Sequence, residues 1–119
     1  MTKPSPQEMQ PLTPAVFYIL LALVDKERHG YGIMREVSLE TAGQLKLGPG
    51  TLYGCLNRML TAGLVEESGE RPDPIIDDQR RRYYRITRSG RRAIRAEAVR
   101  LSSAAAAAQR KRLLPEARA

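Results

Sequence analysis

Ten consecutive apolar residues, Ala15–Val24, constrain the fold of this chain more than any other feature of the sequence. They follow Thr13 and Pro14, which suit an N-cap and a first helical turn, so the pattern predicts a helix over residues 14–25. A helix that is apolar on nearly every side must be covered on both flanks. In a chain of 119 residues, we expect one of those flanks to belong to another subunit.

Length and rare residue types exclude several classes of protein. The length suits one domain, and the apolar run is shorter than the roughly 20 residues that span a bilayer. The polar, proline-rich residues 1–11 do not resemble a signal peptide. Cys55 is the only cysteine and His29 the only histidine, which excludes an internal disulfide and leaves no zinc site or Ser/His/Asp triad motif. We therefore expect a soluble cytoplasmic protein that is not an enzyme, holds no metal or cofactor and does not enter a membrane.

The charge is concentrated in the last third of the sequence. The net charge of the chain is +7, but residues 80–119 contain 13 basic and 2 acidic residues, whereas residues 1–79 contain 7 basic and 11 acidic ones. A basic segment of this kind indicates a polyanionic partner, either nucleic acid or a membrane surface.

Two amphipathic helices are predicted in the middle of the chain. The first covers about residues 31–41, after a turn at residues 29–32, and the second covers about residues 51–62, after a tight turn at residues 48–50. Gly63 is expected to cap the second of them. Its apolar face consists of Leu52, Leu56, Met59 and Leu60. Its opposite face consists of Tyr53, Gly54, Asn57, Arg58 and Thr61.

A β-hairpin and a long helix complete the expected fold. Residues 64–68 and 80–87 have the composition of two strands, with a proline- and aspartate-rich loop over residues 69–79. The last helix runs from Ser89 to about Leu113, with a thin heptad-like seam. The seam is formed by Ile94, Ala98, Leu101, Ala105 and Ala108. The predicted fold class is therefore mainly α with a two-stranded β-hairpin.

This order of elements is that of a winged helix-turn-helix with a C-terminal dimerisation helix. In such a fold the third helix enters the major groove and the hairpin reaches the neighbouring backbone. Arg and Asn side chains can pair with guanine and adenine, and wing arginines can contact phosphates. We predict a disordered arm over residues 1–12, a DNA-binding domain over residues 13–88, a dimerisation helix over residues 89–114 and a frayed tail over residues 115–119.

Four stretches of this sequence resemble the PadR family of bacterial transcriptional regulators. They are LTPAVFYILLAL, HGYGIMREV, GPGTLYGCLNRMLTAGLVEE and RRYYRITRSGRRAI, which together cover roughly residues 12–94. The resemblance implies a dimeric winged-helix repressor, of a kind that often controls efflux pumps or detoxification and is sometimes released by a small effector. The single short last helix resembles the compact subgroup of the family. Family members commonly have proline after GTLY, where this chain has Gly54, a difference that bears on the operator sequence.

The site predictions form three groups. The residues expected to contact double-stranded DNA are Lys46, Thr51, Tyr53, Gly54, Asn57, Arg58, Arg80, Arg81 and Arg82. The residues expected at a homodimer interface are Val16, Phe17, Leu20, Ile94, Ala98, Leu101, Ala105 and Ala108. A small hydrophobic effector is expected to contact Phe17, Tyr18 and Leu21.

Two other functions fit the sequence. A sequence-tolerant nucleic-acid-binding protein would use the basic last third without reading bases. A protein-interaction module could retain the winged-helix scaffold and bind no DNA, because a fold alone does not fix a function. The operator, the regulated gene, the effector and the direction of regulation are not encoded in any feature of the sequence that we recognise.

Overall fold

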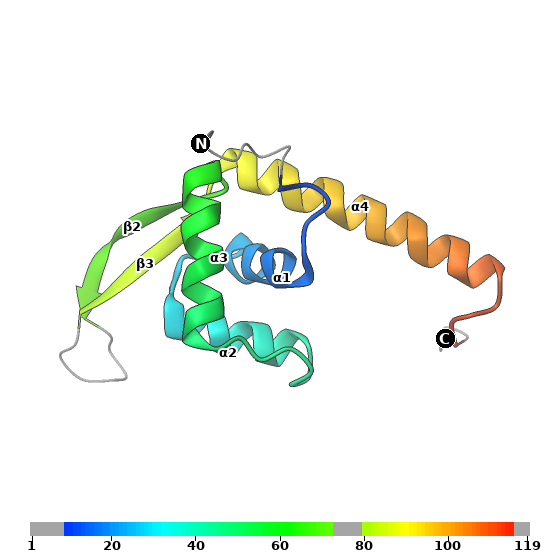
Figure 1. The fold of residues 1–119 in the computed structure, drawn as a ribbon, viewed down its shortest axis with the longest axis horizontal. Coiled ribbons are helices and arrows are strands. Elements are labelled where there is room, and N and C mark those ends of the chain that lie inside the picture. The colour runs from blue at the N-terminus through cyan, green and yellow to red at the C-terminus, as the bar shows by residue number, and fades with distance from the viewer. Residues whose placement is uncertain (1–8, 73–79, 116–119) are drawn as a thin grey trace.

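The computed structural model describes residues 9–72 and 80–115, without the side chains of residues 71, 72 and 80. Its elements follow the order α1 (Pro14–Val24), β1 (Arg28–His29), α2 (Gly30–Glu40), α3 (Pro49–Ala62), β2 (Val65–Pro72), β3 (Arg80–Ile86) and α4 (Arg88–Arg110) (Figure 1). The three strands form an antiparallel sheet in the order β1-β3-β2. Among the described residues, no helix has the length and apolarity to cross a membrane. The prediction of a mainly helical winged fold is confirmed.

Helix α1 is the centre of the core, as its composition requires. The Thr13 hydroxyl accepts a hydrogen bond from the Val16 N–H at 3.2 Å and caps the first turn. Val16 and Leu20 are 1% and 0% exposed within a single copy of the chain, so their assignment to a dimer interface is wrong. Helix α1 contacts α2, α3, α4 and β3 of the same chain, a set of neighbours that the linear sequence does not reveal. Only Phe17, Tyr18 and other half-buried side chains remain at the outer edge of α1.

The sheet has a third strand that the sequence did not predict. Strand β1 is only two residues long, and it pairs with β3 through Arg28 opposite Tyr84 and His29 opposite Tyr83. Two residues are too few to produce an alternating pattern, so the expected two-stranded hairpin was incomplete. His29 then caps α2, because its Nδ1 accepts the Gly32 N–H at 3.0 Å.

The hairpin of β2 and β3 extends away from the helices (Figure 1). Its register shifts between Glu67 and Gly69, where Gly69 adopts a φ of 114° that favours glycine. Of the paired tyrosines on β3, Tyr84 is 4% exposed and belongs to the core, whereas Tyr83 is half-buried on the other face. Burial raises the pKa of the Tyr84 phenol. The predicted loop over residues 69–79 is shorter, because β2 continues to Pro72, and residues 73–79 lie outside the described residues.

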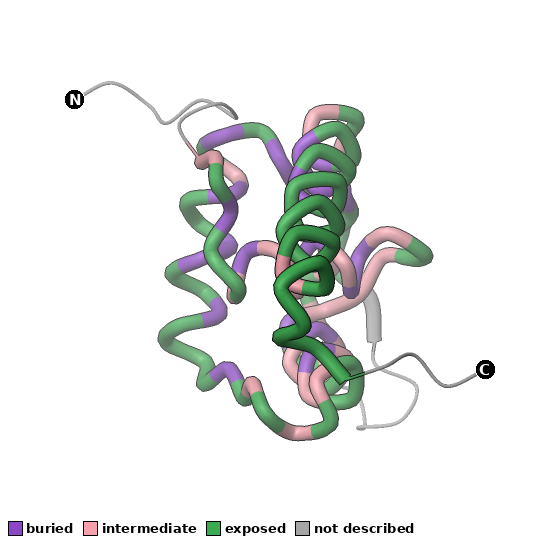
Figure 2. Tube along the Cα trace, turned by 90° about the vertical axis from the view of Figure 1, so that its right-hand side faces the viewer, coloured by how far each residue is buried: buried purple, intermediate pink, exposed green. Residues whose placement is uncertain are grey.

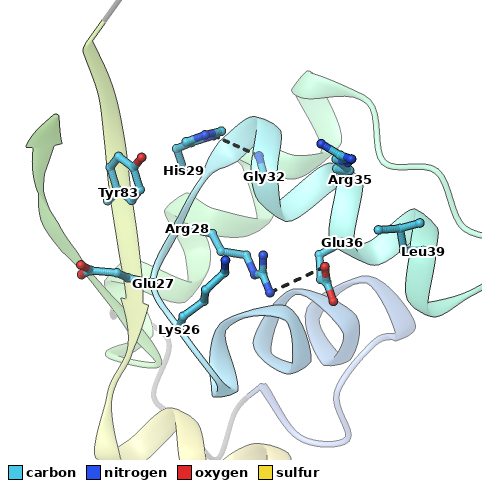
Figure 3. A pocket seen from close by; sticks show the side chains of 9 residues that line it. All are labelled: Lys26, Glu27, Arg28, His29, Gly32, Arg35, Glu36, Leu39 and Tyr83. Carbon is cyan, nitrogen blue, oxygen red and sulfur yellow. Dashed lines mark hydrogen bonds and ion pairs between the residues drawn. The ribbon is translucent and has the colours of Figure 1, made fainter. Parts of the chain in front are cut away.

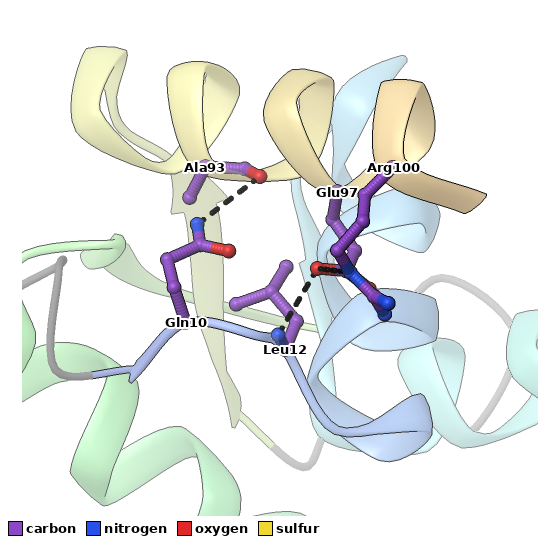
Figure 4. Close-up of polar contacts among 5 residues, drawn as sticks. All are labelled: Gln10, Leu12, Ala93, Glu97 and Arg100. Atoms are coloured by element: carbon purple, nitrogen blue, oxygen red, sulfur yellow. Dashed lines mark hydrogen bonds and ion pairs between the residues drawn. The ribbon is translucent and has the colours of Figure 1, made fainter. Parts of the chain in front are cut away.

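Residues 9–12 are packed against α4 and do not belong to a disordered arm. Leu12 is 6% exposed, and its N–H donates to the Glu97 carboxylate at 3.2 Å (Figure 4). The Gln10 side-chain amide donates to the Ala93 carbonyl at 3.4 Å. The prediction of an arm over residues 1–12 is therefore wrong for its last four residues, and residues 1–8 lie outside the described residues.

Helix α4 buries one face of its first half in the core, whereas its second half is exposed (Figure 2). Gly90, Ala93, Ile94 and Glu97 are buried in the core formed by the other helices and the sheet. After Glu97, every residue of α4 except the half-buried Ala108 is exposed in a single copy. The first half thus packs with the other helices and the sheet as one unit, and a domain boundary at residue 89 does not describe the packing. The helix ends at Arg110, short of the predicted residue 113, and residues 116–119 of the predicted tail lie outside the described residues.

The buried Glu97 carboxylate joins the N-terminal segment to α4. Besides the Leu12 N–H, it accepts hydrogen bonds from Arg100 Nε at 3.1 Å to each of its oxygens. Arg100 lies one helical turn after Glu97 and pairs with it, whereas Arg91 donates to the Val24 carbonyl. The hydrogen bond from Arg100 holds the pKa of the Glu97 carboxyl below its ordinary value of 4.5.

We expect this carboxylate to make stability depend on acidity. Because its pKa is lowered by folding, ionised Glu97 stabilises the fold above the ordinary carboxyl pKa, and that stabilisation is lost as the pH falls through the lowered value. Glu97→Gln should lower the melting temperature by several degrees at neutral pH, and the difference from the unsubstituted protein should shrink in acid. Circular dichroism melts over that range measure both effects.

Glu40→Gln is the matched control, because Glu40 is an exposed carboxylate at the end of α2. Its melting temperature should stay close to that of the unsubstituted protein. Equal shifts for the two variants, or a Glu97→Gln difference that does not change with pH, would contradict the role assigned to Glu97.

Candidate nucleic-acid interface

The outer face of α3, the helix that precedes the hairpin, is exposed and polar. All six of its side chains or backbone positions are exposed: Thr51, Tyr53, Gly54, Asn57, Arg58 and Thr61. The helix contains no acidic residue, and Arg58 is its only charged side chain. The opposite face, with Leu52, Leu56 and Met59 at 0–1% exposure, is anchored in the core. The face can therefore approach a polyanion without losing any packing contact.

Backbone chemistry fixes where α3 starts and stops. Gly48 lies at the N-cap, Pro49 at the first turn, and Gly63 adopts the left-handed conformation with φ of 79° at the C-cap. The helix thus begins two residues earlier than predicted, because proline is pre-organised for a first turn. Its first turn carries Thr51, so the exposed N-terminal end of α3 contains a hydroxyl and free backbone N–H groups, which suit a phosphate oxygen.

Tyr53 links α3 to the start of α2. Its phenol lies directly over Gly30, where any β-carbon would collide with the ring oxygen. The side chain is still 44% exposed, so the same ring packs within the chain and presents its edge outward. Arg58 has a partner too, since its guanidinium donates to the Cys55 thiol at 3.5 Å, a weak contact that leaves most of its donors available.

The three predicted wing arginines differ from one another. Arg80 begins β3 opposite Pro72, and its side chain lies outside the described residues. Arg81 is half-buried, and its Nε has no hydrogen-bond acceptor among the described residues. Arg82 forms cross-strand ion pairs with Glu67 at 3.4 Å and Glu70 at 4.0 Å. The wing is therefore less cationic than its sequence indicates.

A further cross-strand pair joins Arg85 to Glu66 at 2.7 Å. In β2 and β3, three described carboxylates thus face Arg82 and Arg85, whose side chains are 56% and 57% exposed. Exposed pairs of this kind stabilise a fold by about 0–1 kcal/mol, so a phosphate can compete for the same arginines.

The exposed side of α2 is a second surface, part apolar and part cationic, which sequence reasoning missed. Tyr31, Arg35 and Leu39 recur every four residues, and Tyr31 and Leu39 are 50% and 66% exposed. Lys46, a predicted DNA contact in the connection to α3, is exposed and lines a shallow hollow together with Tyr31 and Arg35. The signal was present in the sequence as an i, i+4 spacing on the face opposite Ile33 and Val37.

The predicted dimer and effector residues divide between the core and the surface. Ile94 is 8% exposed and, like Val16 and Leu20, packs within the chain. Ala98, Leu101 and Ala105 are exposed on the second half of α4, with Ala108 half-buried. Phe17, Tyr18 and Leu21 are half-buried at the edge of α1, and the rings of Phe17 and Tyr18 meet edge to face at 5.3 Å. One copy of the chain thus leaves five of the eight predicted dimer residues accessible: Phe17, Ala98, Leu101, Ala105 and Ala108.

Three core helices, a hairpin and an acid-free polar face on the third helix define the class of winged helix-turn-helix proteins. Comparisons with known proteins agree. The model of the transcriptional regulator PadR-like family matches residues 19–96, and the chain belongs to that family. The resemblance seen in the four sequence stretches is confirmed.

The relatives include characterised and solved proteins. A transcriptional regulator of Mycobacterium tuberculosis is 34% identical over 77 residues, which cover 65% of this chain and 65% of that protein. The match thus spans less than two thirds of each curated relative, with 64% of a protein of Lysinibacillus sphaericus and 22% of a transposon protein of Streptomyces fradiae. A PadR family transcription regulator from Clostridium difficile R20291 has a TM-score of 0.68 at 20% identity, over 82% of this chain and 97% of that one. Bacillus subtilis PadR, solved in complex with operator DNA, has a TM-score of 0.59 at 19% identity, over 74% and 46% of the two chains.

Proposed function

We propose that the chain is a sequence-specific DNA-binding transcriptional regulator that works in the cytoplasm as a homodimeric repressor. The observation that carries this proposal is the outer face of α3, which is exposed, free of acidic residues and furnished with Asn57 and Arg58. These two side chains can pair bidentately with adenine and guanine in the major groove. Membership of a family of transcriptional regulators, and a relative solved with operator DNA, support the same function.

A two-fold dimer would present two copies of α3 to one face of the DNA. Such recognition helices lie about 34 Å apart, one helical turn of DNA, and require a pseudo-palindromic operator. The exposed half of α4 supports this arrangement, because it extends beyond the rest of the molecule with Leu101 41% exposed (Figure 1).

A gel-shift experiment tests the proposed function. The full chain is titrated against DNA from upstream of its own gene and against random DNA of equal length, at low and near-physiological salt. Specific regulation predicts a preference for the upstream DNA that persists at the higher salt. Equal binding to both DNAs with the same steep salt dependence indicates a sequence-tolerant basic protein instead, and no binding even at low salt indicates a protein-interaction module.

We expect Leu101→Glu to dissociate the dimer. The substitution places a charge in the proposed seam, where burial without a partner is unfavourable, and should raise the dimer Kd about a hundredfold. Sedimentation at micromolar concentration measures the change. Ser103→Glu is the matched control, because residue 103 lies on the opposite side of α4 by helical periodicity. A folded monomer of the unsubstituted chain, or the same dissociation for both variants, would remove α4 from the interface.

A small hydrophobic effector that releases the repressor is part of the same proposal. Phe17, Tyr18 and Leu21 support it, because they form a half-buried aromatic and aliphatic edge that a second α4 would partly cover. A ligand that inserts there would change the packing between the two copies, and through it the spacing of the two α3 helices.

A further inference from the structure

A cavity of about 370 Å³ lies between β1, α2 and β3, away from the outer face of α3 (Figure 3). Its volume falls in the range of about 300–1,000 Å³ that is usual for small-molecule sites. Two aromatic rings, His29 and Tyr83, form one wall and meet edge to face at 5.3 Å. The exposed side chain of Leu39 adds an apolar surface at the far end. The cavity is thus large enough for a small organic molecule with a flat body.

The charged side chains around this cavity differ in whether they are already paired within the chain. Arg28, whose side chain is 14% exposed, donates to the Ala22 carbonyl at 2.7 Å and pairs with Asp25 at 3.5 Å and Glu36 at 3.6 Å. Arg28 thus offsets part of the charge of the Glu36 carboxylate, which it shares with Asp25. Glu27, the other carboxylate of the wall, is engaged in an interaction of its own.

Two cationic side chains of the wall have no such partner among the described residues. Lys26 and Arg35 are exposed, and neither forms an ion pair or side-chain hydrogen bond anywhere in residues 9–72 or 80–115. They come from different elements, Lys26 from the connection after α1 and Arg35 from α2. The start of α2, with Gly32 in the wall, is capped by His29 and offers no free donor there. Unpaired positive charge in the wall therefore comes from two side chains, Lys26 and Arg35.

We propose that this cavity binds a small organic dianion, a dicarboxylate or phosphate monoester, held between Lys26 and Arg35 with its body against the His29 and Tyr83 rings. Two separated cations favour two anionic groups on one molecule over a single one. Arg35 offers a planar fork of donors that suits a carboxylate or phosphate, whereas Lys26 offers a point charge. Arg28 lines the cavity without being a main ligand contact, because its guanidinium is already held by the Ala22 carbonyl, Asp25 and Glu36.

The proposed ligand site also includes residues of elements next to or within the proposed DNA-binding surface. Arg35 belongs to the helix before α3, and Tyr83 belongs to the wing strand, so a bound dianion would tie α2 to β3. This second step rests on the proposed DNA binding. If the ligand favours one spacing of α2 and wing, DNA and ligand affinities must change each other by the same factor.

Calorimetric titration of the full chain with phthalate and phenyl phosphate tests the binding step without DNA. We expect saturable binding of one dianion per chain, with the monoanion benzoate about tenfold weaker. Lys26→Gln and Arg35→Gln should each weaken phthalate binding about tenfold, because each removes one charge-assisted contact. Both residues are exposed, so both variants should fold, which circular dichroism verifies.

Lys111→Gln and Arg95→Gln are the matched controls, because each removes an exposed cation in or next to α4 that does not line the cavity. Their phthalate affinity should be unchanged. The proposal is overturned if neither dianion binds at millimolar concentration, or if all four variants lose affinity alike, as a merely basic surface would. It is also overturned if Lys26→Gln and Arg35→Gln weaken DNA binding while neither dianion binds, because the cations would then be phosphate-backbone contacts.

Discussion

Gly90→Ala should lower the free energy of unfolding by about 3 kcal/mol, the largest loss of stability that we expect from a single methyl group. Gly90 is buried where α4 crosses the turn between α3 and β2, and a β-carbon there would overlap the Leu64 carbonyl oxygen and lie 2.7 Å from Ile86 Cγ1. The Leu64 carbonyl cannot simply withdraw, because it accepts the Thr87 N–H at 3.1 Å. Helix propensity alone predicts the opposite sign, a gain of about 1 kcal/mol from replacing a helical glycine with alanine.

Denaturant unfolding of the purified chain measures this effect, and the same protein contains its control. Gly54 is also a helical glycine, in the middle of α3, but nothing lies within 4 Å of the position of its β-carbon. Gly54→Ala should therefore raise stability by about 0.5–1 kcal/mol. If Gly90→Ala also stabilised the chain, the close crossing of α4 over Leu64 would be wrong.

Arg58→Ala should reduce the preference for operator over random DNA by about 1–3 kcal/mol, a loss of roughly tenfold to more than a hundredfold. The guanidinium is the only charged group on the outer face of α3, and its bidentate geometry matches guanine. The discrimination is measured as the ratio of Kd values for the upstream DNA and for random DNA at fixed salt. The contact with the Cys55 thiol is weak, so folding should survive the substitution.

Two further variants are compared with Arg58→Ala in the same experiment. Arg81→Ala should weaken both DNAs alike, because a wing arginine contacts phosphate and carries no sequence information. Arg92→Ala changes an exposed cation of α4 and should leave the ratio of Kd values unchanged. An equal loss on both DNAs for Arg58→Ala would exclude this residue from base readout, and a changed ratio for Arg92→Ala would show that the ratio reports charge alone.

Local patterns predicted the helices and their faces. The 3.6-residue period identified Leu52, Leu56 and Met59 as the buried side of α3 and left Asn57 and Arg58 outside, because a helix face depends only on near neighbours in sequence. The same holds for Ile33 and Val37 of α2, which are both fully buried. The exposed face proposed to read DNA could therefore be predicted before any tertiary contact was known.

Features that depend on distant residues could not be predicted. The Glu97 carboxylate accepts the Leu12 N–H across 85 positions, so no neighbour in the sequence indicates that this acidic residue is buried. The Arg82 pairs depend on a hairpin register that shifts at residues 67–69, and no pattern in the sequence specifies such a shift. The apolar surface of Val16 and Leu20 was correctly expected to need cover, but the chain's own helices supply it.

The cross-strand ion pairs of the hairpin have a consequence for how the protein, on its proposed function, would search a genome. When Arg82 or Arg85 turns to a phosphate, it leaves Glu67 or Glu66 beside the negatively charged backbone. In each such contact the arginine exchanges a glutamate carboxylate for a DNA phosphate. Binding of the wing to a duplex of arbitrary sequence therefore releases little free energy. The exchange becomes favourable only where the groove geometry lets both arginines and the α3 side chains engage together. On the proposed function, a wing built in this way would filter sites by shape and shorten the time spent on the wrong ones.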